Sequence, residues 1–260
     1  MTIEEFKSKN GHLVEGLWLP RVTSITGIIS KPGLFYYYAK HKNFSSAQAA
    51  LNQAAAWGTA VHTTVENLLR DNKKKIDKKL LPSVNAFNKW REKHRVKIFN
   101  PKTDIERQVS DFENYYAGTL DALLEIDGEF GILDIKTGSS IWDEYSLQLA
   151  AYLNAYNQNV TAKKKAKKRW ILRIDQYQEC KLCGAKKRNK LMRAKITGGD
   201  KNCFHQFGEE KGVYEFKELS GFEKDLEGFL SAKKLWEWSN NNFLENIRDY
   251  PKNKKTLKLF

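Results

Sequence analysis

Two runs of alternating apolar and polar residues near the middle of the chain, GTLDALLEI and EFGILDIK, have the pattern of neighbouring β-strands. The pair Asp127-Gly128 separates them, and Asp-Gly is favoured in two-residue type I′ turns. The pattern therefore predicts a β-hairpin over about 117–137, with Ile126 opposite Glu129.

Apolar residues elsewhere recur at helical or strand spacing. Helices are predicted over about 46–69, 82–95, 143–156 and 222–239, and strands over about 103–109, 169–175 and 213–219. The apolar stripe of the first helix contains Val61, Val65 and Leu68, and the inward side of the last contains Phe222, Leu226, Phe229, Leu230 and Leu235. Lys31-Pro32-Gly33 predicts a turn before an aromatic helix. Strands interleaved with helices indicate an α/β fold.

A long polar segment interrupts the last predicted strand pair, 169–175 and 213–219. We therefore expect one domain over residues 1–260, with residues 176–212 as an insertion within it. The lysine-rich stretch 73–79 predicts a loop, and residues 251–260 predict a loose tail.

Composition supports a folded protein. Hydrophobic residues make up 41% of the 260 residues and aromatic residues 12%, which allows a sizeable core. No apolar run approaches the ~18 residues of a membrane-spanning helix, and MTIEEFKSKNGH lacks the features of a signal peptide. These features predict a soluble, cytoplasmic protein with no membrane partner.

Positive charge is concentrated in one part of the chain. The net charge is +14, and residues 161–201 hold fifteen Lys or Arg against three Asp or Glu, a local charge of +12. Such a segment favours binding to phosphate backbones. The alternative is a solvated basic loop.

The predicted hairpin register places Asp121 opposite Asp134, with Lys136 on the same face. The other face carries Leu120, Ala122, Leu124, Leu133 and Ile135, which can pack on helices. The Cβ atoms of such cross-strand partners lie about 4.5–5.5 Å apart. Two carboxylates that close repel unless a cation neutralises them, and oxygen ligands suit Mg²⁺ or Mn²⁺. With a lysine beside them, the set indicates metal-assisted phosphodiester hydrolysis. The alternative is an ordinary charged, solvent-facing hairpin.

Two pairs of polar residues lie four positions apart on predicted helices and so share a helical face. His62 and Glu66 form the first pair and could meet one metal ion. Gln148 and Tyr152 form the second and could bind or stack on a nucleic-acid strand. Either pair alone would be read as a surface contact or a partly buried polar pair.

Together the motifs GTAVH with Glu66, GTLD, DIKTG and QLAAY resemble the PD-(D/E)XK nuclease superfamily, in its RecB-like branch. The pattern is most similar to the mitochondrial genome maintenance exonuclease type and to related phage or bacterial nucleases. The opening PRVTSITGIISKPGL is also similar to that group, so the resemblance covers about residues 18–175 and the last strand and helix. In this chain Leu120 stands where the motif has its proline.

The resemblance implies a restriction-endonuclease-like core with a mixed central β-sheet flanked by helices. It implies a Mg²⁺ or Mn²⁺ site and a catalytic group on matching positions. The implied metal ligands are His62, Asp121, Asp134 and Ile135, with Glu66 a further candidate; the implied catalytic residues are Asp121, Asp134, Lys136, Gln148 and Tyr152.

The cysteines lie within the basic segment. Cys180 and Cys183 form a CxxC turn, and Cys203 with His205 follows about twenty residues later, which predicts a structural Zn²⁺ site. The alternative is a set of reduced thiols. Some RecB-like relatives bind an iron–sulfur cluster through an upstream cysteine, but this chain has no cysteine before Cys180.

These observations predict a metal-dependent DNA exonuclease that acts on single strands or DNA ends, in a process such as DNA replication or repair. One alternative is a structure-specific or restriction-type endonuclease on the same fold. A nucleic-acid-binding protein without catalysis is the alternative of another class, and the intact set of Asp121, Asp134 and Lys136 argues against it.

Overall fold

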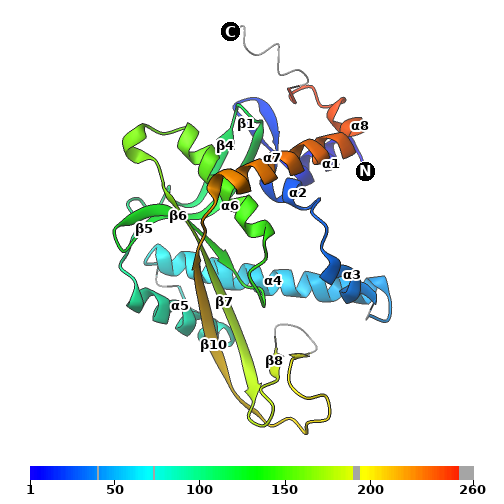
Figure 1. The fold of residues 1–260 in the computed structure, drawn as a ribbon, viewed down its shortest axis with the longest axis vertical. Helices are drawn as coiled ribbons and strands as arrows, with labels where there is room; N and C mark the ends of the chain where they lie inside the picture. The colour runs from blue at the N-terminus through cyan, green and yellow to red at the C-terminus, as the bar shows by residue number, and fades with distance from the viewer. Residues whose placement is uncertain (40, 73, 190–193, 252–260) are drawn as a thin grey trace.

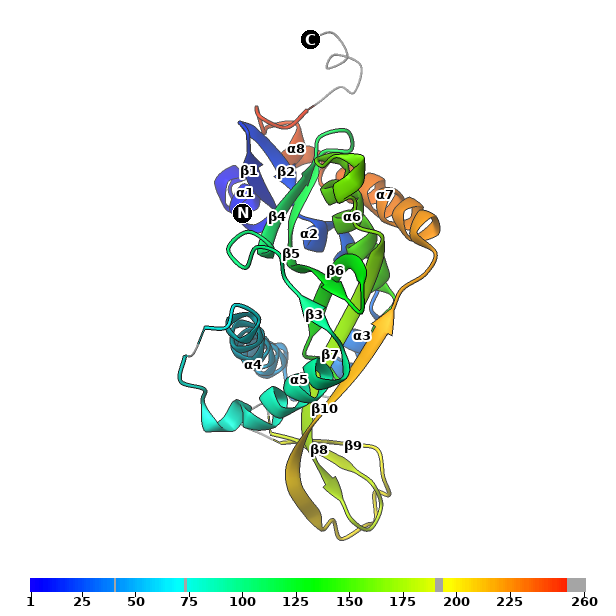
Figure 2. The same ribbon diagram turned by 90° about the vertical axis from the view of Figure 1, so that its left-hand side faces the viewer.

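A mixed β-sheet divides the molecule into two helical layers (Figures 1 and 2). The computed structural model describes residues 1–39, 41–72, 74–189 and 194–251; the predicted tail 251–260 therefore lies almost entirely outside the described residues. Strands in the sheet follow the order β3-β5-β6-β7-β8-β9, with β4 paired to β5 and β10 paired to β7. Only β6 and β7 run parallel among these pairs.

The helices are α1 (Ile3–Asn10), α2 (Val22–Thr26), α3 (Pro32–Ala39), α4 (Phe44–Leu69), α5 (Leu81–Lys93), α6 (Glu144–Gln158), α7 (Phe222–Ser239) and α8 (Asn241–Leu244). The sheet strands are β3 (Val96–Lys97), β4 (Ile105–Asp111), β5 (Tyr116–Ile126), β6 (Glu129–Lys136), β7 (Lys168–Cys180), β8 (Lys186–Arg188), β9 (Lys195–Thr197) and β10 (Phe207–Glu218). A separate hairpin comprises β1 (Gly11–Val14) and β2 (Leu17–Pro20). The expected α/β fold, a mixed central sheet flanked by helices, is confirmed.

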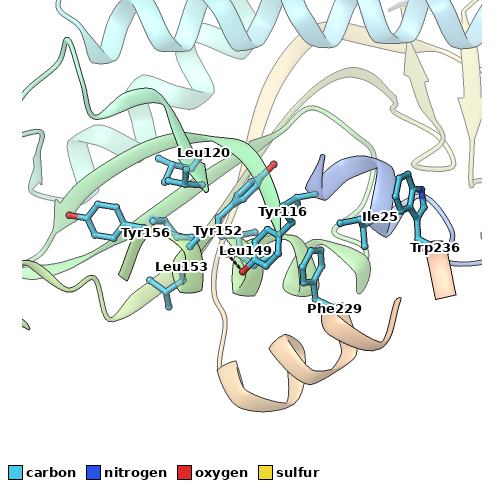
Figure 3. Packing of buried hydrophobic residues seen from close by; sticks show 14 of the residues in the cluster. Ile25, Tyr116, Leu120, Leu149, Tyr152, Leu153, Tyr156, Phe229 and Trp236 are labelled. Atoms are coloured by element: carbon cyan, nitrogen blue, oxygen red, sulfur yellow. Dashed lines mark hydrogen bonds between the residues drawn. The ribbon is translucent and has the colours of Figure 1, made fainter. Parts of the chain in front are cut away.

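Each helical layer packs on its own hydrophobic cluster. On one face, α1, α2, α6 and α7 cover a cluster that includes Tyr116, Leu149 and Phe229 (Figure 3). On the other face, α4 and α5 cover a cluster that includes Val65 and Trp90. Because α6 connects the parallel strands β6 and β7, its position is fixed against the sheet at the end of β6.

The central hairpin is confirmed. Asp127 and Gly128 have φ angles of 54° and 92°, the left-handed conformation that a type I′ turn needs at both positions. The predicted register is also confirmed, from the pair beside the turn as far as Ala122 and Leu133.

Pairing between β5 and β6 stops before Asp121 and Asp134. From there β5 continues along β4, and β6 continues along β7, where Asp134 lies opposite Ile171. The expected direct pairing of Asp121 with Asp134 is not formed. Instead, Asp121 Oδ2 accepts a hydrogen bond from the N–H of Ile135 at 2.6 Å. The side chain thus takes the place of a backbone acceptor where the strands separate.

Side chains of β5 change face at the same point. Ala122 and Leu124 pack with α4 and α5 as predicted, but Leu120 packs with α6 on the opposite face, so the prediction for Leu120 is wrong. The neighbouring strand has an irregularity at the matching position, because Glu106 has a φ of 55°. Regular alternation along β5 could not reveal this local twist.

Three predicted element boundaries or packing positions need correction. The aromatic helix begins at Pro32 itself, since proline suits the first position of a helix. In α4, Leu69 is buried and Leu68 only half-buried. On α7 the prediction for Leu235 is wrong: its side chain is 52% exposed, and Trp236 is buried instead.

The remaining boundaries shift by a few residues. α4 begins two residues early because Asn43 caps its first turn by accepting a hydrogen bond from the Ser46 N–H. β7 and β10 are longer than predicted and form a ribbon that extends beyond the rest of the sheet (Figure 1). No described helix has the length and apolar character of a membrane span.

Close packing of α5 on β10 gives a test of the fold. At Gly212, an added Cβ would lie 1.6 Å from the carbonyl oxygen of Pro82. Gly212→Ala should therefore lower the free energy of unfolding by about 1–3 kcal/mol or more, measured by chemical denaturation. Gly208→Ala, on the same strand with its nearest contact at 3.7 Å, is the control and should be neutral or slightly stabilising. Equal stability of the two variants would contradict this packing.

Candidate active site

Residues from α4, β4, β5, β6 and α6 converge where β5 and β6 separate. Asp121 on β5 and Asp134 on β6 carry largely buried carboxylates, with side-chain exposures of 12% and 3%. The backbone of Ile135 lies between them and uses its N–H to bond Asp121. The candidate site thus forms around the junction of two strands and the helices on both faces.

His62 joins α4 to this junction. Its Nε2 lies 2.9 Å from the carbonyl oxygen of Ile135 and 3.1 Å from Asp121 Oδ2, and its Nδ1 lies 3.0 Å from Glu66 Oε1. Both ring nitrogens therefore face acceptors, as a protonated imidazole would. The predicted pair of His62 and Glu66 is brought to Asp121 and Ile135.

A second chain of contacts begins at Asp134. Lys136 Nζ donates to Asp134 Oδ1 at 3.0 Å and to Gln148 Oε1 at 3.2 Å. Gln148 Nε2 in turn donates to the hydroxyl of Tyr152 at 3.0 Å. The lysine, predicted from β6, and the two polar residues, predicted from α6, thus form one continuous network.

Glycines in the motifs make room for this network. An added Cβ at Gly118 would lie 2.5 Å from the ring of Tyr152, and one at Gly58 would lie 2.9 Å from Thr137 Oγ1. The small residue of GTLD therefore lets Tyr152 pack against β5. Gly58 of GTAVH likewise lets α4 approach the end of β6, where its close neighbour is the side chain of Thr137 and not the backbone.

The carboxylates have unlike environments. Burial acts to raise the pKa of Asp121, but the positive charge of His62 and its hydrogen bond outweigh burial and lower that pKa. Burial raises the pKa of Asp134 to about 6, despite the opposing charge of Lys136. Asp121 is therefore the more firmly ionised of the two.

The two cationic partners are stabilised in their charged forms. Burial acts to lower the pKa of His62, but the Asp121 carboxylate and the acceptors around the ring raise it to about 11. Burial also acts to lower the pKa of Lys136, but the negative charges of Asp134 and Asp121 outweigh this effect and raise that pKa. The site therefore balances its acids with side-chain cations.

The residues present fit a divalent cation. Asp134 Oδ2 is buried and forms an ion pair with Lys136 Nζ at 2.8 Å. The Asp121 carboxylate and the Ile135 carbonyl supply further oxygen atoms beside it. Such a set of hard oxygen donors suits Mg²⁺ or Mn²⁺.

Two residues at the site are absent from the sequence prediction. The register of β4 against β5 places Glu106 opposite Asp121. Its carboxylate, a ring nitrogen of His62 and the carboxylate of Glu66 have ligand atoms within 4.8 Å of one another. Burial and the nearby charges of Glu66 and Asp121 raise the pKa of Glu106 to about 7. The second residue is Tyr145 of α6, whose ring centroid lies 4.6 Å from Lys136 Nζ. The register of β4 against β5 would have indicated Glu106, and the position of the start of α6 would have indicated Tyr145. Neither feature can be read from the spacing of motifs along the sequence.

The four predicted zinc ligands lie together, away from the sheet junction. Ligand atoms of Cys180, Cys183, Cys203 and His205 are all within 4.8 Å of one another. They occupy the end of the β7–β10 ribbon, beside β8 and β9. The structure therefore brings the four residues together, and zinc binding by them stays a prediction.

Comparison with known protein families agrees with the geometry of the junction. The family model described as "PD-(D/E)XK nuclease superfamily" matches residues 32–237, a span that includes α4, the β5–β6 hairpin, α6 and the β7–β10 ribbon. A comparison with curated proteins found no match. Nucleases of this superfamily use divalent metals, typically Mg²⁺ or Mn²⁺, which is the kind of ion that the oxygen donors at the junction suit. The chain belongs to the PD-(D/E)XK nuclease superfamily.

Proposed function

We propose that the protein is a Mg²⁺- or Mn²⁺-dependent DNA exonuclease of the RecB-like branch, acting on single-stranded DNA or DNA ends. The observation that carries this proposal is the meeting of two networks at one strand junction. One network contains His62 and Asp121, and the other contains Asp134 and Lys136. Together they supply acidic ligands and a lysine within one site.

Asp121, Asp134 and the Ile135 carbonyl would hold the cation, with His62 beside them and Glu66 or Glu106 as further oxygen donors. When bound, the ion supplies Lewis-acid charge to the phosphate and to the attacking water. For His62 to act as a ligand, its ring must lose a proton, because a neutral imidazole nitrogen is the donor to metals.

Lys136 would orient the reacting groups. As an ammonium held by Asp134 and Gln148, it can donate a hydrogen bond to the attacking water or to a phosphate oxygen. Gln148 and Tyr152 hold the lysine in place from α6. Hydrolysis adds the water oxygen to phosphorus and breaks one P–O bond, leaving one product with a phosphate and the other with a hydroxyl.

Exposed aromatic side chains support a single-stranded substrate. On α3, Phe35 and Tyr36 are 69% and 71% exposed, and bases can stack on such rings without sequence preference. One end of α3 adjoins the site, since Lys31 Nζ lies 3.1 Å from Glu144 of α6. The other end adjoins the basic segment, since Lys195 Nζ lies 5.7 Å from the ring centroid of Tyr37.

The helix α3 therefore lies between the start of α6, beside the candidate active site, and Lys195, in the part of the basic segment 161–201 beyond β7. Lysines of that segment would hold the phosphate backbone, while the α3 rings contact bases. This arrangement favours an unpaired strand, because bases in a duplex are stacked on each other and shielded from side-chain rings.

Substitution of the acids and of the lysine tests the assignment of the site. Asp121→Asn, Asp134→Asn and Lys136→Ala should each lower Mg²⁺-dependent cleavage by at least about 100-fold, while Lys136→Ala still binds DNA. Cleavage of end-labelled DNA with Mg²⁺, Mn²⁺ or EDTA measures this. Glu106→Gln should raise the Mg²⁺ concentration needed for half-maximal cleavage, since one oxygen charge near the ion is lost.

Asp71→Asn is the matched control for these variants, because the Asp71 side chain is 85% exposed and lies outside the candidate site. It should cleave as the unchanged protein does. Full cleavage by purified Asp134→Asn, or undiminished cleavage in EDTA, would contradict the assignment of the site.

Dependence on a free end separates the exonuclease from the endonuclease alternative. We expect linear single-stranded DNA to be degraded and a covalently closed single-stranded circle of the same sequence to be spared. Gel analysis of both substrates over one time course is the measurement. Rapid cutting of the circle would instead support an endonuclease on the same fold.

Removal of the α3 rings tests the substrate. Stacking on an aromatic side chain contributes about 1–3 kcal/mol per base, so Phe35→Ala with Tyr36→Ala should weaken single-strand binding by about tenfold or more. Fluorescence anisotropy with catalytically impaired protein measures affinity for single- and double-stranded DNA. Trp238→Ala removes an equally exposed ring from α7, where exposure is 78%, and should have no effect. An equal loss on both substrates would argue against stacking.

A further inference from the structure

The ribbon tip, residues 181–206 between β7 and β10, carries the cysteine cluster. Cys180 is the last residue of β7, Cys183 follows in the turn, and Cys203 and His205 lie just before β10. Two separate loops of the tip therefore bring their donor atoms to one point. The cluster is not part of the candidate active site.

The donor separations fit one tetrahedral ion. With Zn–S bonds of about 2.3 Å and Zn–N bonds of about 2.0 Å, tetrahedral geometry requires about 3.8 Å between two sulfurs and about 3.5 Å between sulfur and nitrogen. Cys180 Sγ and Cys203 Sγ are 3.9 Å apart, and Cys183 Sγ and His205 Nδ1 are 3.4 Å apart. A disulfide would need sulfurs about 2.05 Å apart, and all three cysteines are free.

The backbone of the first loop is shaped to hold both thiols toward this point. The Gly184 N–H donates to the Cys180 carbonyl at 3.0 Å, and the Cys180 N–H donates to the Ala185 carbonyl at 2.8 Å. Gly184 has a φ of 71°, which glycine adopts without strain. The second loop approaches closely, because an added Cβ at Gly199 would lie 2.7 Å from Cys183 Sγ.

The described residues of the tip form no hydrophobic core of their own. Among its described residues, Ala185 alone is buried, and its large apolar side chains are exposed: Leu182 by 60%, Ile196 by 46% and Phe204 by 93%. Apolar burial is therefore too small to order these loops, and a bound ion is the usual substitute in such small elements.

We propose that Cys180, Cys183, Cys203 and His205 bind one structural Zn²⁺ ion that fixes the ribbon tip. Three thiolates and one imidazole form a complete tetrahedral set, which leaves no open position for catalysis. A cluster of several iron atoms is larger than one ion and uses four cysteine ligands in its common form; this chain offers three.

The ion would fix the position of the basic side chains that the tip presents. Lys186 Nζ and the Arg188 guanidinium lie 4.8 and 5.4 Å from the ring centroid of Tyr177 on β7. Arg188 also pairs with the buried carboxylate of Asp175 at 2.9 Å, which anchors β8 to the ribbon. On β9, Lys195 lies over Tyr37 of α3. Loss of the ion would release the loops that support these contacts.

Metal analysis of the purified full-length chain tests the proposal. We expect about one zinc per chain, neither iron nor acid-labile sulfide, and, after replacement by Co²⁺, the absorption bands of a tetrahedral thiolate site. Cys180→Ser with Cys183→Ser should lose the zinc and become sensitive to trypsin within the lysine-rich tip. Asp134→Asn is the matched control and should keep the zinc, since it alters only the junction site.

A titration of the protein without substitutions provides a test whose result does not depend on whether the variants fold. A mercurial reagent should release zinc in step with modification of the three thiols, with a metal-sensitive dye as the readout. Absence of zinc, iron with sulfide, or zinc retained after Cys180→Ser with Cys183→Ser would each overturn the proposal. None of these readouts requires cleavage of DNA, so the result does not depend on the proposed nuclease activity.

Discussion

The hydrogen bond from the Ile135 N–H to the Asp121 carboxylate is the contact on which the arrangement of the site depends. In an uninterrupted hairpin, a backbone carbonyl would accept from this N–H. A side-chain acceptor satisfies the donor and lets β5 leave β6 without a buried, unpaired amide. The Ile135 carbonyl is then available to His62, so one residue of β6 connects β5 to α4.

Charge balance at this junction explains how four buried ionisable groups coexist. Asp121 is neutralised mainly by His62, and Asp134 mainly by Lys136. Unpaired burial of either acid would be costly, so the side-chain cations stabilise the site; in the proposed function, a divalent ion would take over part of their role. With His62 as one of the proposed ligands, its proton and the metal ion would compete, and binding of the ion would release protons.

Sequence patterns predicted the hairpin, its turn and most of its register because Asp127-Gly128 specifies the turn geometry and the alternation fixes the faces. Motif spacing also brought His62, Lys136 and Gln148 to one site. Local pattern failed where tertiary contacts decide: Leu120 changes face at the twist beside Glu106, and Trp236 rather than Leu235 enters the core. The elements α1, β1, β2 and α2 were not predicted, since residues such as Phe6 and Trp18 find their partners on α8 and near the end of the described chain.

The strand β7 connects the junction to the ribbon tip, and its length fixes the distance between them. Ile171 of β7 pairs with Asp134 at the junction, and Cys180 ends the same strand at the ribbon tip. At about 3.3 Å per residue, the path between them is roughly 30 Å. In the proposed function, a nucleic acid that binds at both ends of β7 would have to span this distance, whereas a shorter oligonucleotide would reach the junction or the tip alone.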